Sequence, residues 1–269
     1  MPTQQRHGKM LGMATDDELA DVRPRLLGMI DEARIVRVRI PRPDPSVVAA
    51  FLTVTDLAST VSDALDRLGI GGAVPASVLR PVIDGGRVVG PAITLRYEPL
   101  GGSVGARYQR NERALLADRD LYGVGQPGDV GVFHSSIGPN VSVMGGLSAT
   151  WAKAAGIAAC IIEGGVRDIA TIRELGQLVW SSGRTPITGR QRVEAVEING
   201  TISLCGIPVR PGDLIAADDT GVCIIPQEHI SDVLQQCQQS EAKEALVTKM
   251  LQDGQPVADI VATLPLDQW

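Results

Sequence analysis

The stretch IAACIIEGGVRD, residues 157–168, decides how this chain folds. Its first six residues are apolar, which is typical of a short strand buried on both faces. Two glycines and the charged pair Arg167 and Asp168 follow directly. We predict that the strand turns into a helix here, and that the helix runs from Asp168 to Leu175.

The segments around this stretch continue the alternation of strand and helix. Apolar runs bounded by Pro-Gly-Asp or by single glycines separate stretches with the 3.6-residue period of a helix. Such spacing predicts an α/β fold with a parallel sheet covered by helices. The expected order is a strand at 129–133, a helix at 147–155, a strand at 157–162, a helix at 168–175 and a strand at 178–181.

The flanking parts of the chain contain further helical periods and, after residue 189, short strands separated by turns such as Asn199-Gly200. The short strands predict antiparallel hairpins. Helices are expected at 16–33, 54–68, 107–122 and 230–251, and strands at 87–96, 194–204, 207–209, 214–216 and 222–225.

Composition argues against several classes of partner. The formal net charge is -6 and aromatic residues make up 3% of the 269 residues, so neither a basic face nor stacking platforms for nucleic acid are expected. No apolar run approaches the ~18 residues of a membrane span. The four cysteines lie far apart without metal-ligand spacing, which fits a reducing cytoplasm. We therefore predict a cytoplasmic protein that binds neither nucleic acid nor a membrane.

Two glycine-rich helix starts predict a site for a small anion. The first is GGLS, residues 145–148, and the second carries Arg167 and Asp168. The backbone N–H groups of Leu147 and Ser148 suit a carboxylate, the guanidinium suits the same group, and the aspartate suits a hard divalent cation. In the alternative interpretation, Asp168 only caps its helix and Arg167 only forms a surface ion pair.

An ordered set of motifs resembles the RraA-like family over about residues 50–255. That family includes class II 4-hydroxy-4-methyl-2-oxoglutarate/4-carboxy-4-hydroxy-2-oxoadipate aldolases, oxaloacetate decarboxylases and regulators of ribonuclease E. The motifs are SDALDRLG (62–69), VGPAIT (89–94), PGDV (127–130), ACIIEGGVRD (159–168) and PGDLIAADDTGVCIIP (211–226).

The resemblance implies a layered αββα domain with a central barrel-like mixed sheet and helices packed outside. We accordingly expect an N-terminal helix and extension over 1–45, the RraA-like domain over 46–255 and a C-terminal tail over 256–269. The resemblance also implies a homo-trimer, or a hexamer of two trimers, with the site at a subunit boundary.

The resemblance further implies a metal-dependent lyase acting on a 2-oxo acid or related hydroxy acid. Arg167 then binds the pyruvyl group, and Asp168 holds Mg²⁺ or Mn²⁺ largely through water. The amides of Leu147 and Ser148 bind the carboxylate, and Gly145 is retained from the family pattern. Such a site stabilises the enolate formed when a C–C bond beside a 2-oxo acid breaks.

The chain departs from the family pattern at several positions. Gly146 stands where the aldolases have an acid that orders water and moves protons, so this proton path is interrupted. His134 and Glu163 stand where the family has aspartates. His134 is a candidate acid or base, with a partly buried histidine as the alternative. Glu244 matches an acid supplied by a neighbouring subunit, with an exposed helix residue as the alternative.

A second function stays open. The loss of an acid at Gly146 favours a non-catalytic protein that binds a protein partner, as the ribonuclease regulators of the family do, whereas retention of Arg167 and Asp168 favours an enzyme. The inserted polar segment from Tyr97 to Arg113 carries Arg107 and Arg110, which either contact an anionic substrate or face the solvent.

Overall fold

A computed structural model describes residues 14–263 and shows a mixed α/β domain around one large sheet. In this part of the chain, ten strands form the sheet in the order β1-β12-β11-β3-β4-β6-β7-β2, with β5 beside β6 and β8 beside β3. The predicted parallel unit is confirmed, because β3, β4, β6 and β7 pair in parallel. The predicted hairpins are confirmed in β9–β10 and β11–β12. The strands are β1 (Ala73–Pro75), β2 (Arg80–Pro81), β3 (Val88–Pro99), β4 (Val130–Ser135), β5 (Ser142–Met144), β6 (Ala159–Val166), β7 (Leu178–Arg184), β8 (Val193–Ile198), β9 (Ile202–Leu204), β10 (Ile207–Val209), β11 (Leu214–Asp218) and β12 (Gly221–Ile225).

The sheet curls around an interior of its own, as the expected barrel-like sheet requires. Side chains from β1, β3, β4, β6, β7, β11 and β12 meet in one buried cluster, although β7 and β11 are far apart in the strand order. The Trp180 indole on β7 donates a 2.9 Å hydrogen bond to the Asp218 carbonyl on β11. This bond joins distant strands across the cluster, so the sheet bends instead of lying flat.

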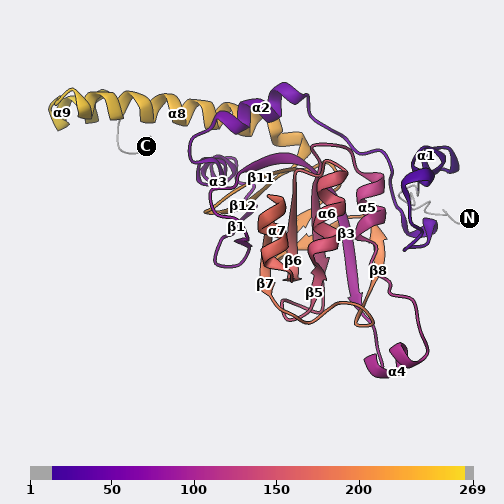
Figure 1. The fold of residues 1–269 in the computed structure, drawn as a ribbon. Helices are drawn as coiled ribbons and strands as arrows, with labels where there is room; N and C mark the ends of the chain where they lie inside the picture. The colour runs from indigo at the N-terminus through magenta and orange to yellow at the C-terminus, as the bar shows by residue number, and fades with distance from the viewer. Residues whose placement is uncertain (1–13, 264–269) are drawn as a thin grey trace, which may run out of the picture.

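Helices cover the outside of the curled sheet (Figure 1). Helices α5, α6 and α7 pack over the parallel strands in one apolar cluster, and α2, α3 and α8 pack against β11 and β12 in another. The two helical layers and the two sides of the curled sheet give the predicted αββα layering. The helices are α1 (Asp16–Val22), α2 (Pro45–Thr53), α3 (Leu57–Arg67), α4 (Val104–Gln109), α5 (Asp118–Val124), α6 (Gly146–Ala154), α7 (Ile169–Leu175), α8 (Ile230–Gln252) and α9 (Val257–Thr263).

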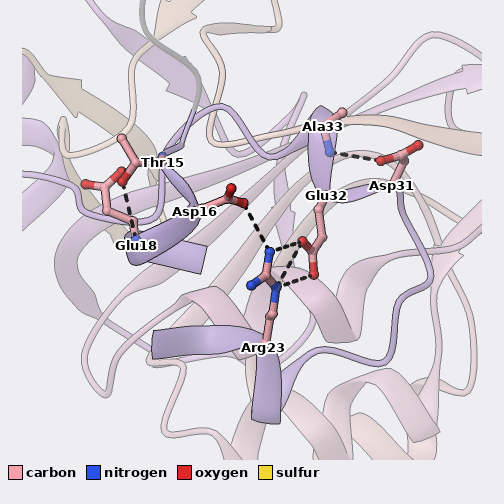
Figure 2. Close-up of polar contacts among 7 residues, drawn as sticks. All are labelled: Thr15, Asp16, Glu18, Arg23, Asp31, Glu32 and Ala33. Carbon is pink, nitrogen blue, oxygen red and sulfur yellow. Dashed lines mark hydrogen bonds and ion pairs between the residues drawn. The ribbon is translucent and has the colours of Figure 1, made fainter. Parts of the chain in front are cut away.

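The prediction of one helix over 16–33 is wrong beyond its first turns. A capping box between Thr15 and Glu18 starts α1, but the helix ends at Val22, before the turn that contains Pro24 (Figure 2). The chain then folds back, and Arg23 holds both Asp16 and Glu32, at 3.3 and 2.9 Å, as Figure 2 shows.

A long-range contact holds residues 26–30, which follow α1 and a short 3-10 turn, in a non-helical form. The buried Asp120 carboxylate on α5 accepts hydrogen bonds from the backbone N–H groups of Leu27, Met29 and Ile30. These N–H groups are the ones a continuous helix would have used internally, so the tertiary contact replaces the helical one.

The prediction of one helix over 107–122 is also wrong. Helix α4 ends near Arg110, and Asn111 adopts φ 52°, a left-handed conformation that stops a helix. An extended stretch with buried Ala117 leads to α5, which starts at Asp118. The break turns the start of α5 toward the core.

Helix α8 continues beyond the body of the domain, with α9 at its far end (Figure 1). Val247, Met250 and Ile260 form a small apolar cluster between the two helices. Leu246, Leu251 and Val257 remain exposed on this projecting arm, which we define as residues 241–263. The predicted C-terminal tail therefore contains a helix in its described part.

Among the described residues, no single helix has the length and hydropathy needed to cross a membrane, and only the bent pair α2–α3 passes such a test jointly. The four cysteines carry no disulfide, and Cys160, Cys223 and Cys237 are buried.

Candidate functional site

A polar pocket lies where β5 and β6 end and where α6 and α7 begin. The space inside it, open solvent included, is about 430 Å³, and the structure brings together Gly145, Leu147, Ser148, Arg167 and Asp168 in its lining. Gly164 and Gly165, predicted to open the second helix, lie within β6 instead. The full lining is Leu116, Asp118, Arg119, Ser142, Val143, Met144, Gly145, Leu147, Ser148, Arg167, Asp168, Thr188 and Arg190.

The Asp168 side chain lines the pocket and does not cap α7, the helix that follows it. The residue precedes α7 with φ 56° and ψ 44°, a left-handed conformation that costs a non-glycine residue about 1 kcal/mol. Its side chain makes no capping hydrogen bond to α7 within the described residues. The Oδ2 atom accepts a 3.0 Å hydrogen bond from the Gly146 N–H on α6 instead. The simple capping alternative is therefore wrong.

Arg167 and Asp168 converge. The Arg167 Nε atom lies 3.4 Å from Asp168 Oδ2, and the two side chains are 38% and 44% exposed. The Arg167 N–H bonds to the Met144 carbonyl, which fixes the end of β6 beside β5. The pair is thus a solvent-accessible ion pair that also lines a pocket, so both groups keep hydrogen-bonding capacity for a ligand.

The glycines allow this convergence. A Cβ atom on Gly145 would lie 2.7 Å from Asp168 Oδ2 and 3.1 Å from Arg167 Nε. A Cβ atom on Gly146 would lie 2.9 Å from the Thr171 Cγ2 atom on α7. The absence of both side chains lets α6 and the Arg167–Asp168 turn approach each other closely.

The start of α6 presents backbone donors to the same pocket. Leu147 and Ser148 belong to the first turn of this nine-residue helix, whose N–H groups have no acceptor one turn earlier. The Leu147 side chain is 58% exposed, whereas Ser148 is 6% exposed and directs its hydroxyl to the Tyr122 phenol at 3.0 Å. The helix start and the Arg167 guanidinium together make the pocket attractive to an anion.

Sequence reasoning missed part of the lining. Asp118, Arg119, Thr188 and Arg190 contribute to the pocket, but none of them stands in a motif with a recognisable spacing. Asp118 and Arg119 lie in the segment that was expected to be an exposed helix. Only the break before α5 brings them to the pocket, and no local pattern indicated it.

His134 lies outside this pocket lining. It sits on β4, one residue after Phe133, which packs under the outer helices, and its side chain therefore extends toward the inner side of the sheet. Its Nδ1 atom lies 2.8 Å from Glu163 Oε2, and this hydrogen bond raises the pKa of the imidazole. Glu163 Oε2 also accepts from the Cys205 N–H. A catalytic role for His134 stays a prediction.

Glu244 lies on the projecting arm, where its side chain is exposed. It does not line the pocket of its own chain. The predicted contribution of this residue to a neighbouring subunit's site is untested, and the arm is the element that such a contribution would use.

The insertion between Tyr97 and Arg113 contributes no arginine to the pocket. Arg107 and Arg110 both bind Glu112, at 2.5 and 2.6 Å. The two guanidinium groups share this one carboxylate and lie outside the pocket lining, which favours the solvent-facing alternative over direct contact with a substrate.

In the described residues, no group of three or more His, Cys, Asp or Glu side chains gathers closely enough to form a metal cage. Two carboxylates line the pocket, of which Asp118 is buried and Asp168 is solvent-accessible, so a cation bound at Asp168 would have to be completed by water and by ligand oxygens. Mg²⁺ binds proteins in this manner, with one or two carboxylates and several retained waters. The site therefore fits a hydrated divalent cation and does not fit a closed structural metal.

Comparisons with known proteins show the family and the fold of this chain. The family model described as Aldolase/RraA matches residues 58–224, a range that contains all the residues that line the pocket. The chain is 30% identical over 194 residues to a protein of Halalkalibacterium halodurans that bears the name "Putative 4-hydroxy-4-methyl-2-oxoglutarate aldolase"; the match covers 72% of this chain and 84% of that protein.

Two solved structures are similar over most of the chain. A protein of Pseudomonas syringae pv. tomato matches with a TM-score of 0.69 and 25% identity, covering 84% of this chain and 97% of that one. The protein RraAS2 of Streptomyces coelicolor, titled as an unusual member of the RNase ES inhibitor RraA family, matches with a TM-score of 0.65 and 26% identity, covering 77% and 98%.

Proposed function

Because this chain belongs to the RraA-like family, described as Aldolase/RraA, we propose that it is a metal-dependent lyase that cleaves a C–C bond next to a 2-oxo acid. One observation carries the proposal. Arg167, Asp168 and the first turn of α6 line one pocket, so an anion binder, a cation ligand and backbone donors face the same space.

The chain's own groups bind and orient the substrate. The N–H groups of Leu147 and Ser148 hold the carboxylate of the 2-oxo acid, and Arg167 donates to the 2-oxo oxygen and to the same carboxylate. When the C–C bond breaks, electrons move onto the 2-oxo oxygen and give an enolate. The guanidinium then faces more negative charge than it did in the bound substrate, so it stabilises the transition state more than the ground state.

Asp168 would hold Mg²⁺ or Mn²⁺ through its carboxylate and water. When bound, the cation supplies positive charge beside the 2-oxo oxygen. The Gly146 N–H bond to Oδ2 keeps the Asp168 carboxylate oriented toward the pocket, a positioning role that needs no side chain on Gly146.

The proposal includes a homo-trimer or a hexamer with the pocket near a subunit boundary. The projecting arm supports this, since it leaves Leu246, Leu251 and Val257 exposed on one chain and also carries Glu244. Exposed apolar side chains on an extended arm are stabilised when a second copy covers them.

Pyruvate release from 4-hydroxy-4-methyl-2-oxoglutarate and from oxaloacetate, measured with Mg²⁺ and with EDTA, tests the proposal. We expect turnover of at least one substrate that EDTA abolishes. Arg167→Ala should lower kcat/KM by about 100-fold or more, as loss of a charge-stabilising donor does. Arg110→Ala, an exposed arginine outside the pocket, should leave the rate unchanged. Absence of pyruvate from both substrates would refute the lyase.

A second candidate is a non-catalytic protein that binds a protein partner. It is favoured by Gly146, which provides no carboxyl group, and by the similarity to a structure titled as a ribonuclease inhibitor family member. Calorimetry with Mn²⁺ and oxalate, an enolate mimic, separates the two. A lyase binds both together in the pocket, whereas a protein that works only through its outer surface binds neither.

A further inference from the structure

Asp118 is a buried carboxyl group at the pocket that lacks a full set of partners. The residue is 2% exposed and lines the pocket together with Arg167 and Ser148. Its Oδ2 atom has no hydrogen-bond partner within the described residues. A buried carboxylate oxygen without a partner costs about 1–3 kcal/mol, more when charged, so its presence calls for an explanation.

The neighbouring residue has the complementary deficit. The Nε atom of Arg119 is also buried without a partner in the described part of the chain, and Arg119 lines the same pocket. Five buried side-chain atoms lack a partner there, and two of them are this acceptor and this donor, adjacent in sequence and at one pocket. A polar ligand in the pocket would satisfy both atoms. This is an expected property of a binding site and not of a packed core.

Other groups hold Asp118 in place. It starts α5, and Asp120 on the same helix is fixed by three backbone N–H groups of the N-terminal segment. Ser148 on α6, whose hydroxyl lies 3.0 Å from the Tyr122 hydroxyl, lines the same pocket beside this carboxyl group. The carboxyl group is therefore supported from both helices that form this wall of the pocket.

Burial makes Asp118 suitable for proton transfer. Burial raises the pKa of this carboxyl group above its ordinary value, and the Ser148 hydrogen bond and the Arg119 charge oppose that shift only in part. A carboxyl group with a raised pKa gains and loses a proton closer to neutrality, where a general acid or base works best. Other titratable groups near it are Arg119, Asp120, Tyr97, Tyr122 and Cys160, and Arg167, Asp168 and Arg190 line the same pocket.

We propose that Asp118 is the proton-transferring residue of this pocket and does the work of the acid that is missing at Gly146. The inference rests on the proposed lyase function. In aldol cleavage, the Asp118 carboxylate takes the proton of the substrate's C4 hydroxyl, the C3–C4 bond breaks, C4 becomes a carbonyl and the electron pair moves into the enolate. Asp118 then returns the proton to C3 of the enolate, which gives pyruvate. The cycle consumes no other reactant.

Two measurements test Asp118 independently of C–C cleavage. The first is exchange of the pyruvate methyl protons for deuterium in D₂O, followed by NMR with Mg²⁺ present. The second is the number of protons taken up when oxalate binds, obtained by calorimetry in two buffers of different ionisation enthalpy. Oxalate adds negative charge beside Asp118 and should therefore favour its protonated form.

We expect wild-type protein to exchange the methyl protons and to take up protons with oxalate. Asp118→Asn keeps the shape of the side chain but cannot accept the proton. It should lower the exchange rate by about 100-fold or more, abolish the proton uptake and leave oxalate affinity within about threefold. The matched control is Asp213→Asn. Asp213 is equally buried but lies at the start of β11, away from the pocket, and its substitution should change neither measurement.

Exchange and proton uptake that persist at wild-type level in Asp118→Asn would overturn the assignment while leaving the lyase proposal intact. Wild-type protein that neither binds oxalate nor exchanges pyruvate protons would overturn the lyase proposal and Asp118 with it. Retention of oxalate binding in Asp118→Asn shows that the variant is folded, so a lost exchange rate then supports the assignment.

Discussion

Gly145→Ala isolates the geometry of the site from its chemistry, because it adds one methyl group and removes no functional group. Gly145 has φ -143° and ψ -170°, an extended conformation that alanine adopts without strain. The new Cβ atom would lie 2.7 Å from Asp168 Oδ2 and 3.1 Å from Arg167 Nε, whereas ordinary contact starts at 3.4 Å. The carboxylate therefore has to move by about 0.7 Å, and the guanidinium by a few tenths of an ångström.

The expected effects on stability and on activity differ strongly. Asp168 Oδ2 ends a partly exposed side chain, and the Arg167 side chain, also partly exposed, has to move by only a few tenths of an ångström at Cγ and Nε, so Tm should change by no more than about 3 °C. Misplacing reacting groups by about 1 Å costs on the order of 100-fold in rate, so we expect kcat/KM to fall about 10- to 100-fold. The affinity for Mn²⁺ should fall too, because Asp168 is its only proposed protein ligand.

Steady-state kinetics, Mn²⁺ calorimetry and thermal unfolding of the same preparation check this prediction. Gly105→Ala serves as the control, since a Cβ atom there meets nothing closer than 3.8 Å. Gly105 lies inside α4, so this variant should gain about 0.5–1 kcal/mol of stability and keep full activity. Unchanged kinetics and Mn²⁺ affinity in Gly145→Ala would show that Arg167 and Asp168 do not act at the contact described here.

Three further substitutions test two ion pairs outside the pocket and the contact between α6 and α7. In urea unfolding, His134→Asn should destabilise the protein by up to about 1 kcal/mol at pH 6 and by less at pH 9. The hydrogen bond to Glu163 raises the pKa of His134, so its stabilising effect is complete below about pH 6.5 and is lost as the pH rises through the folded-state pKa. An equal loss of stability at both pH values would contradict this. Arg42→Met should lower the free energy of unfolding by about 3 kcal/mol, because it removes the 2.7 Å ion pair of the Asp129 carboxylate, whose side chain is 1% exposed. A change in Tm below 2 °C would argue against a buried pair. Gly146→Ala should lower the free energy of unfolding by about 1–3 kcal/mol, because the added methyl group meets Thr171. In a double-mutant cycle, this loss should largely disappear when Thr171 is also replaced by alanine. Additive effects of the two substitutions would exclude this contact.

The close contact at Gly146 also bears on the missing acid. A carboxylate side chain at this position, which the resemblance to the aldolases implies for them, would need Thr171 to move, so Gly146→Asp disturbs the α6–α7 contact. The pocket lining nevertheless contains a second carboxyl group besides Asp168, that of Asp118 on α5.

Local sequence was sufficient for the elements that contain their own signals. The strand predicted at 157–162, which in the structure spans Ala159–Val166, the helix after Asp168 and the hairpins near the C-terminus follow from apolar period and turn residues, which act within a few positions of each other. The extension of this strand through Gly164 and Gly165 was not predicted. The family motifs likewise placed Arg167 and Asp168 at one helix start. The glycines at 145 and 146 leave the space in which these two side chains converge.

The tertiary structure decided what depends on contacts between distant segments. The predicted helix does not continue past Val22, because Asp120, about ninety positions away, accepts hydrogen bonds from the backbone N–H groups of Leu27, Met29 and Ile30. Asp118 became part of the pocket only because that contact and the break near Asn111 orient α5, and no pattern in the sequence encodes either. Periodicity reports which face of an element is apolar, whereas the partner of that face is chosen by packing across the whole domain.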